Sequence, residues 1–405
     1  MSVVVGPARN PGATDHPFID DLIAKNAQAL SGQLTTLMNR LFPPQSQKAL
    51  RHFSGGEVAR ILGITDGYLR QMMIAGDIVE PEKGAAGRRQ YTLQRIHEIR
   101  EHLGRGKAAY IRKRNDQEHL QVIAVTNFKG GSGKTTTSTH LAQYLVLHGY
   151  RVLAIDLDPQ ASMSSLLGCQ PELDQSENQT LYGAIRYDEK QVPLGSIIRH
   201  TYFTGLDLVS GNLELMEFEH DTPRMLADKK NHDSLFFARV ARAIATVEKD
   251  YDVVVIDCPP QLGFLTLSAL CAATGIVITI NSQMLDVASM AQFLTMAAGL
   301  LSVVRAAGAD LNYDFLRYAI TRFEPNDGPQ AQVAAFLRNL FGDLVLTNTM
   351  LKTTAISDAG LLKQTLYEIS RDQLNKQTYD RAMDSMDTLN AEIEMTIRKA
   401  WGRVA

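Results

Sequence analysis

The feature that most constrains this chain is a glycine-rich loop, FKGGSGKTTTSTH, at residues 128–140. It follows an apolar run, VIAVTN, that has the composition of a buried strand, and it opens a helical stretch over 134–149. Glycines in such a loop let backbone N–H groups turn inward around phosphate oxygens, and the N-terminus of the next helix adds partial positive charge. Strand, loop and helix in this order predict a phosphate-binding loop; a purely structural glycine-rich turn is the alternative.

The loop departs from the usual pattern, G-x-x-x-x-G-K-[ST], at its start. Phe128 stands where that pattern has its first glycine, and Lys129 adds a second cation close to the phosphates. We expect Lys134 to reach the β- and γ-phosphates of ATP, the Thr135 hydroxyl to bind Mg²⁺, and Thr136 to assist at the α-phosphate. The residues predicted to bind the nucleotide are Gly130, Gly131, Ser132, Gly133, Lys134, Thr135 and Thr136.

The rest of the chain from residue 120 onward indicates an α/β fold. Helical stretches alternate with apolar runs, which read VIAVTN, RVLAIDLD, YDVVVIDCPP, GIVITI and FLRYAITRF. Near-continuous apolar strands separated by helices indicate a parallel sheet buried on both faces. We therefore predict a parallel-sheet P-loop NTPase domain over 120–405. Its last helix, over 374–402, carries an apolar stripe that we expect to pack in the core.

Three carboxylates follow strands of this predicted sheet. Asp156 and Asp158 end one apolar run, and Asp257 ends another. Ligands of open α/β sheets bind at the carboxyl edge of the strands, and an acidic residue there commonly holds Mg²⁺. We predict Asp156 and Asp257 as metal-shell residues and Asp158, further out, as the residue that positions the attacking water. The alternative is that either Asp156 or Asp158 only caps the helix from about residue 160.

A second pattern, FSGGEVARILGITDGYLRQMMIAGDI, predicts a helix–turn–helix. The first helix covers 55–62, Gly63 makes the turn, and Thr65 caps a second helix. A glycine-rich tip and a helix from about residue 93 then complete a winged helix–turn–helix, similar to that of MerR-type regulators. The residues predicted to contact DNA are Thr65, Tyr68, Arg70, Gln71, Arg88 and Arg89. A small helical packing domain is the alternative.

These patterns divide the chain into four segments. Residues 1–50 form an N-terminal tail with a helix over 18–42, 51–103 the winged helix–turn–helix domain, 104–119 a basic linker, and 120–405 the ATPase domain. The 18–42 helix has an apolar seam of two heptad series that either mediates dimerisation or packs on its own domain; both interpretations stay open. The seam consists of Ile23, Leu30 and Leu37, and of Ala27, Leu34 and Leu41.

Charge and composition limit the classes of function that this chain can have. Residues 1–118 hold 17 Lys and Arg against 12 Asp and Glu, whereas the remainder holds 24 against 32, which suggests an appended module for an acidic partner. Three scattered cysteines fit a reducing compartment, and we expect neither a signal peptide nor a membrane span. We predict a soluble, cytoplasmic protein.

The segments KGGSGKTTT, AIDLDPQAS and VVVIDCPP together resemble the ParA/MinD class of deviant Walker A ATPases, and specifically ParA-type partition proteins. The resemblance implies that Lys129 crosses a homodimer interface to the partner's phosphates, with Lys134 and Asp158 as further catalytic residues. It also implies non-specific DNA binding around 347–360, where Lys352 is basic. The stretch GGEVARILGITDGYLRQMMIAGDIVEPEKGAAGRRQYTL is similar to RepA, the group of partition ATPases from repABC replicons.

Three functions follow as hypotheses. The first is an ATP- and Mg²⁺-dependent plasmid partition ATPase that dimerises on ATP, binds DNA, is stimulated by a ParB-type centromere-binding protein, and represses its own operon. The second is a nucleotide-sensing transcriptional repressor with negligible turnover, in which Asp158 is dispensable. The third, a cell-division or metal-delivery ATPase of the same class, is disfavoured by the helix–turn–helix and by the absence of a Cys-x-x-Cys pair from the sequence.

Overall fold

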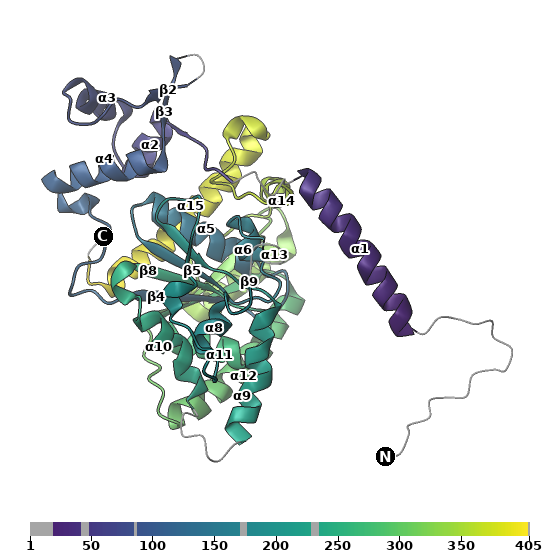
Figure 1. Cartoon of the computed structure of the whole chain (residues 1–405). Coiled ribbons are helices and arrows are strands. Elements are labelled where there is room, and N and C mark those ends of the chain that lie inside the picture. The colour runs from purple at the N-terminus through teal and green to yellow at the C-terminus, as the bar shows by residue number, and fades with distance from the viewer. Residues whose placement is uncertain (1–18, 42–47, 85–86, 171–175, 228–234, 404–405) are drawn as a thin grey trace, which may run out of the picture. The chain divides into compact units, whose positions relative to one another are not determined.

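The computed structural model describes two compact units, residues 1–48 and 49–405, and within them the ranges 19–41, 48–84, 87–170, 176–227 and 235–403 (Figure 1). The smaller unit contains helix α1 (Ile19–Leu41), as predicted. The Ile23 and Leu30 side chains of its apolar seam are exposed. The side chains of Leu34, Leu37 and Leu41 lie outside the described part, so the choice between the two interpretations of this helix stays open.

The larger unit is built on a twisted seven-stranded sheet in the order β10-β9-β4-β8-β5-β7-β6. All neighbouring strands pair in parallel except β6, which runs antiparallel to β7 at one edge. The strands are β4 (Gln121–Thr126), β5 (Val152–Asp156), β6 (Arg199–His200), β7 (Leu206–Val209), β8 (Val253–Asp257), β9 (Gly275–Asn281) and β10 (Phe315–Thr321). The five strands predicted from apolar runs are confirmed, and the short edge strands β6 and β7 were not predicted.

Helices cover both faces of this sheet and bury it (Figure 1). They are α5 (Lys134–Leu147), α6 (Ser162–Leu166), α8 (Leu181–Ile185), α9 (Met216–Ala227), α10 (Arg239–Ala245), α11 (Phe264–Ala272), α12 (Met284–Ala306), α13 (Gly328–Phe341), α14 (Thr354–Leu361) and α15 (Lys376–Ala400). Every residue of β4, β5 and β8 is buried, which explains why these strands have almost no polar alternation. The predicted C-terminal stripe is confirmed as core, since Met386, Leu389 and Ile393 of α15 are fully buried.

The N-terminal part of the larger unit has a helix, a turn, a helix and a hairpin in succession. Its elements are β1 (Phe53–Ser54), α2 (Gly55–Leu62), α3 (Asp66–Ile74), β2 (Glu82–Lys83), β3 (Arg89–Tyr91) and α4 (Leu93–Gly106). Ser54 and Glu57 form a capping box at the start of α2, and Gly63 ends that helix with a φ of +69°, a conformation that favours glycine. The hairpin β2–β3 follows the two helices where a wing was predicted, and β1, which precedes them, pairs antiparallel with β3.

This N-terminal part packs tightly on the nucleotide-binding part. Arg100 of α4 is 4% exposed and donates hydrogen bonds to the Ile61 carbonyl (2.8 Å) and the Leu147 carbonyl (3.4 Å). The ring of His97 bonds to the Val146 carbonyl at 2.9 Å. Because Val146 and Leu147 end helix α5, the two side chains hold the C-terminus of the helix whose N-terminus carries the phosphate loop.

The segment predicted as a linker, 104–119, is folded against the rest of the unit. Its first residues complete α4, and Arg114 donates to the carbonyls of Tyr251 and Glu118 at 2.9 Å each. Arg403, near the C-terminus, in turn binds Glu118 and the carbonyl of Lys113. Arg114 and Arg403 thus hold the later part of this basic segment against the rest of the unit.

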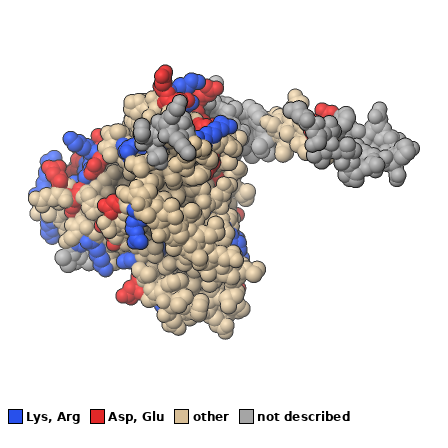
Figure 2. Space-filling view, turned by 90° about the horizontal axis from the view of Figure 1, so that it is seen from below, with Lys and Arg blue, Asp and Glu red and all other residues tan. Residues whose placement is uncertain are grey.

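Helix α12 is unusually apolar for its exposure. Within the described residues it is the one helix whose length and composition would suit a membrane span, and only 22% of the relevant window is buried. A single helix of this kind is weak grounds for a membrane protein, and none was expected. Figure 2 shows a broad area without charged side chains on the larger unit. At the start of α12, Met284 is 71% exposed and Leu285 79% exposed.

Candidate nucleotide-binding site

The predicted phosphate loop connects β4 to α5 and is fixed by the two neighbouring strands. The Thr279 hydroxyl of β9 donates to the Ser132 hydroxyl at 3.0 Å, and the Thr321 hydroxyl of β10 donates to the Ser132 carbonyl at 2.7 Å. Gly133 has a φ of +84°, and a Cβ there would lie 3.0 Å from the Met350 Cε atom. The loop thus needs glycine at Gly133 for both backbone conformation and space.

The loop opens into a cleft of about 430 Å³. All seven residues predicted to bind the nucleotide line it, together with Asp158, Gln160, Ser162, Pro260, Arg322, Met350, Leu351, Lys352, Thr353, Ile356 and Ser357. The Lys134 side chain is buried, and its ammonium donates to the Lys129 carbonyl at 3.1 Å. Burial lowers the pKa of Lys134, and the nearby carboxylate of Asp257 opposes this effect. The cleft therefore brings the seven predicted nucleotide-binding residues together with Asp158, whereas Lys129, Asp156 and Asp257 are not among the residues that line it.

Two carboxylates meet on adjacent strands beside the loop. Asp156 of β5 and Asp257 of β8 are register partners, and both side chains are fully buried. Neither Asp257 oxygen has a well-formed hydrogen bond among the described residues. Burial, reinforced by Asp156, raises the pKa of Asp257, and the hydroxyls of Thr135 and Ser138 only partly oppose this. A buried carboxylate without strong partners is unfavourable unless a cation joins it, so Asp257 suits a metal ion at this position.

Asp156 has a different environment from Asp257. Its Oδ2 accepts hydrogen bonds from the Ser164 backbone N–H (2.8 Å) and hydroxyl (2.7 Å), and its Oδ1 accepts one from the Asp158 backbone N–H (3.1 Å). Ser164 lies in the first turn of α6. Asp156 therefore satisfies an N–H group near the start of α6, and its role beside a metal ion stays a prediction. Asp158 lines the cleft, where its Oδ1 accepts a hydrogen bond from the Gln160 N–H at 2.9 Å.

Phe128 and Lys129, the two residues that make the loop unusual, both contact helix α12. The ring of Phe128 stacks on Phe293, with centroids 5.8 Å apart and an interplanar angle of 19°. The ammonium of Lys129 forms an ion pair with the carboxylate of Asp286. The side chain that was expected to cross to a second chain is thus bound within its own chain in this structure.

Two further basic residues, Lys352 and Arg322, line the cleft. Lys352, predicted to contact DNA, forms an ion pair with Glu324 at 2.8 Å and lines the nucleotide cleft. Arg322, which sequence reasoning missed, follows β10 with a φ of +52° and donates to the Gly131 carbonyl at 3.3 Å. Its position at the end of the apolar run FLRYAITRF was the available signal, because the strand end places it at the same sheet edge as the loop.

The residues predicted to contact DNA are mostly exposed on the N-terminal part. Tyr68, Arg70 and Gln71 of α3 are exposed, and Arg70 also pairs with Asp66 at 2.5 Å. The Thr65 hydroxyl caps α3 by accepting a hydrogen bond from the Tyr68 N–H at 3.1 Å. In the hairpin, Arg88 is exposed and Arg89 half-buried.

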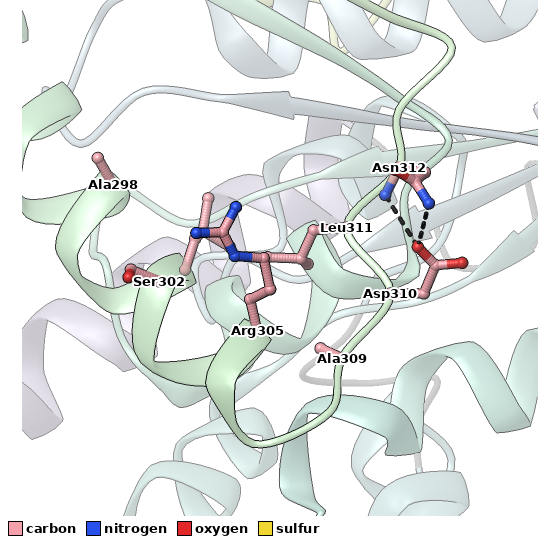
Figure 3. Close-up of a pocket in the computed structure, with 8 residues that line it drawn as sticks. Ala298, Ser302, Arg305, Ala309, Asp310, Leu311 and Asn312 are labelled. Atoms are coloured by element: carbon pink, nitrogen blue, oxygen red, sulfur yellow. Dashed lines mark hydrogen bonds between the residues drawn. The ribbon is translucent and has the colours of Figure 1, made fainter.

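A second pocket, of about 390 Å³, lies at the C-terminal end of α12 (Figure 3). Its polar groups include Arg305, Asp310 and Asn312, and the Asp310 carboxylate accepts two hydrogen bonds from Asn312. Arg305 lies 19 residues along α12 from Asp286, the residue that pairs with Lys129, which corresponds to about 28 Å at 1.5 Å per residue. None of the predicted site residues lines it.

Known proteins resemble this chain over most of its length. A family described as an AAA domain matches residues 120–304. A "Putative replication protein A" of Rhizobium rhizogenes is 54% identical over 94% of this chain and 95% of its own, and Protein SopA of Escherichia coli strain K12 is 30% identical over 82% and 84%. A solved structure named "Partition Protein" has a TM-score of 0.64 at 17% identity, over 94% of this chain and 99% of its own.

The site of this chain holds a lysine-containing phosphate loop, a strand-end carboxylate pair and the parallel sheet that positions them. The identity to the first of them extends through the N-terminal helices as well as the nucleotide-binding part. The resemblance expected from the sequence motifs is confirmed. We conclude that this chain belongs to the ParA-type family of P-loop partition ATPases, within its RepA group.

Proposed function

We propose that the protein is a Mg²⁺-dependent ATPase that partitions plasmid DNA. The observation that carries the proposal is the buried Asp257 carboxylate, which interacts with Lys134 and Thr135 of the phosphate-loop cleft. This arrangement suits a nucleotide triphosphate together with a cation that would offset the carboxylate charge. Family membership supports ATP hydrolysis in general, and these residues supply the reason for Mg²⁺.

The candidate metal ligands are few, which fits Mg²⁺ bound partly by phosphate. Across the described ranges, no group of three or more His, Cys, Asp or Glu side chains could hold a metal ion. Mg²⁺ commonly takes only one or two protein carboxylates or hydroxyls and completes its octahedron with phosphate oxygens and water. We propose that Thr135 and Asp257 contact the cation and that Asp156 contributes charge through its position beside Asp257. Asp158, which lines the cleft, would orient the attacking water.

The remaining parts of the proposal concern the assembly of two copies and the binding of DNA. We propose that two copies assemble around ATP and that Lys129 of one copy stabilises phosphate charge in the other. The exposed Tyr68, Arg70, Gln71 and Arg88 support operator binding and autorepression by the N-terminal part, since such side chains contact bases and phosphates. Non-specific DNA binding by the ATPase dimer and stimulation by a ParB-type partner complete the proposal, with the protein acting in the cytoplasm on plasmid or nucleoid DNA.

A turnover experiment tests this proposal directly. ATP hydrolysis is measured for the wild type and Lys129→Ala, alone, with non-specific DNA, and with DNA plus the cognate ParB-type protein. We expect slow basal turnover that rises with both partners in the wild type and does not rise in Lys129→Ala, because the variant lacks the cation for the second copy's phosphates. Turnover that ignores the ParB-type protein would argue against partition.

A nucleotide-sensing repressor is the second candidate, and the docking of α4 on the end of α5 favours it. His97 and Arg100 connect the N-terminal part rigidly to the helix that begins at the phosphate loop. Replacement of Asp158 by alanine separates the candidates. For an ATPase we expect turnover to fall by at least tenfold with ATP affinity kept, because only the water-orienting carboxylate is lost. In a repressor without turnover, Asp158→Ala would leave nucleotide-dependent operator binding unchanged, as measured by fluorescence anisotropy with operator DNA.

A further inference from the structure

A short loop between β8 and α11 forms part of the wall of the nucleotide cleft. It covers residues 258–263 and connects Asp257, at the end of β8, to Phe264, the first residue of α11. Pro260 of this loop lines the cleft. The loop is therefore held at one end by the strand that carries the proposed metal ligand and at the other end by the start of α11. Because it is short, a shift of that helix start would also move the wall of the cleft.

The N-terminus of α11 is capped by a side chain from another helix. Gly263 occupies the N-cap position of α11 and has no side chain with which to cap it. The Glu219 carboxylate of α9 caps it instead, since its Oε2 accepts a hydrogen bond from the Phe264 N–H and its Oε1 one from the Leu265 N–H, each at 2.9 Å. Both bonds satisfy N–H groups that have no partner inside the helix, and the negative charge complements the helix dipole.

Gly263 leaves the room that this carboxylate occupies. A Cβ at Gly263 would lie 2.4 Å from the Glu219 Oε1 atom, and the three atoms nearest to it would all belong to the Glu219 carboxylate group. The backbone of Gly263 is extended, with a φ of −93° and a ψ of −172°, a conformation that other residues also adopt. The space taken by Glu219, and not the backbone conformation, therefore requires a glycine at this position.

Helix α9 is itself held next to Glu219. The Phe218 side chain is fully buried, and its ring stacks on that of Tyr187 with centroids 5.6 Å apart. Three residues along α9, the Asp221 carboxylate accepts a hydrogen bond from the Tyr182 hydroxyl of α8 at 2.7 Å. Side chains on packed helices hold their partners more precisely than side chains on loops do. Glu219 therefore presents its carboxylate to α11 from a fixed helix.

We propose that Glu219 is a positioning residue for ATP turnover, which acts by holding the start of α11 and with it the loop over 258–263. The inference rests on the proposed ATPase activity. Glu219 is not among the residues that line the cleft, so it acts through this loop and not by contact with the nucleotide. The phosphates are expected to bind a different loop, over 130–136. Loss of Glu219 should therefore affect turnover more than nucleotide binding, because reaction rates are sensitive to displacements of about 1 Å.

Steady-state ATP turnover, measured together with binding of a fluorescent ATP analogue, tests the proposal. For Glu219→Ala we expect turnover at saturating ATP to fall about tenfold, because the wall of the cleft is no longer held in one position. The affinity for the analogue should stay within about twofold of the wild-type value, since the phosphate loop is intact. Glu217→Ala is the matched control, because it removes an exposed glutamate two residues earlier in α9 and should change neither quantity.

A second substitution disturbs the same contact from the side of α11. The methyl group of Gly263→Ala would displace the Glu219 carboxylate, so we expect a similar fall in turnover with affinity for the analogue kept. In a Glu219→Ala background the methyl group has room. Gly263→Ala should then cause little further loss of turnover, because the two residues act as one unit.

The proposal is wrong if either single variant turns over ATP at the wild-type rate, if affinity for the analogue falls as much as turnover does, or if the two losses add in the double variant. A wild type without turnover would instead contradict the proposed ATPase. Circular dichroism checks that each variant is folded. Phe264 also packs edge-on against Phe236, with ring centroids 5.2 Å apart, so α11 keeps apolar contacts without Glu219. If Glu219→Ala is nevertheless unfolded, Gly263→Ala, which keeps the glutamate, decides the question by the same comparison of turnover with affinity.

Discussion

Replacement of Lys134 by alanine should lower ATP turnover by about 100-fold or more and weaken nucleotide binding. A fall of this size is typical when an enzyme loses one preorganised hydrogen-bond donor that faces the charge developing in the transition state. Lys134 is the buried cation of the cleft, and its ammonium already points to the loop, where it donates to the Lys129 carbonyl. A triphosphate bound on the loop would meet this ammonium without any movement of the backbone.

The same substitution also changes the balance of charge beneath the cleft. Lys134 is the cation whose attraction acts on Asp257, where burial already raises the carboxyl pKa. Without it, the pKa of Asp257 rises further, so the carboxyl is more often protonated at neutral pH. We expect the loss of turnover in Lys134→Ala to persist at saturating ATP, because the donor that faces the phosphates is missing however much ATP is bound.

Titration with a fluorescent ATP analogue and steady-state turnover, each at several Mg²⁺ concentrations, measure the two effects. Lys190→Ala is the control, since it removes an exposed lysine outside the cleft and should change neither quantity. If Lys134→Ala bound the analogue within about tenfold of the wild type and turned over at a similar rate, the loop would not be the nucleotide site.

The sequence predicted the sheet and the phosphate loop well because both depend on local patterns. Buried parallel strands have continuous apolar runs, and five of these located β4, β5, β8, β9 and β10. The phosphate loop is recognised from its glycines together with the apolar strand before it and the helix after it, all of which are neighbours in sequence. The edge strands β6 and β7 were missed because two and four residues are too short to show a period.

Contacts between distant segments could not be read in the same way. Asp156 was predicted as a metal-shell residue from its place at a strand end, and in the structure it accepts hydrogen bonds from Ser164 of α6. An aspartate that caps a helix and one that binds a metal look the same in the sequence when both end a strand. The pair of Lys129 with Asp286 joins a loop to a helix far along the chain. The segment 104–119 was predicted as a linker from composition alone, and Arg114 binds the Tyr251 carbonyl and Arg112 the Glu394 carboxylate, which composition does not reveal.

Arg100→Ala should destabilise the larger unit by about 3 kcal/mol, because it removes a charged donor from buried carbonyls. Arg100 connects α4 to the turn after α2 and to the end of α5. Burial, and then the neighbouring Arg112, lowers its pKa to about 10, so it stays charged at neutral pH. A cation at the C-terminus of α5 also complements the helix dipole. Gly149, with a φ of +95°, makes room for it, since a Cβ there would lie 2.5 Å from the Arg100 Cδ atom.

Urea unfolding followed by circular dichroism measures this loss, and Arg105→Ala is its control. Arg105 lies in the last turn of the same helix and is exposed, so its removal should change the free energy of unfolding by less than about 0.5 kcal/mol. Limited trypsin digestion gives a second measurement, since α4 is followed by the basic residues Lys107, Arg112 and Lys113. If Arg100 fastens the N-terminal part to α5, its loss should expose this segment to cleavage more than the control does. Equal unfolding free energies and equal cleavage would mean that apolar packing alone joins the N-terminal part to α5. In that case Arg100 would provide no polar connection from the end of α5, and so from the phosphate loop, to helices α2, α3 and α4.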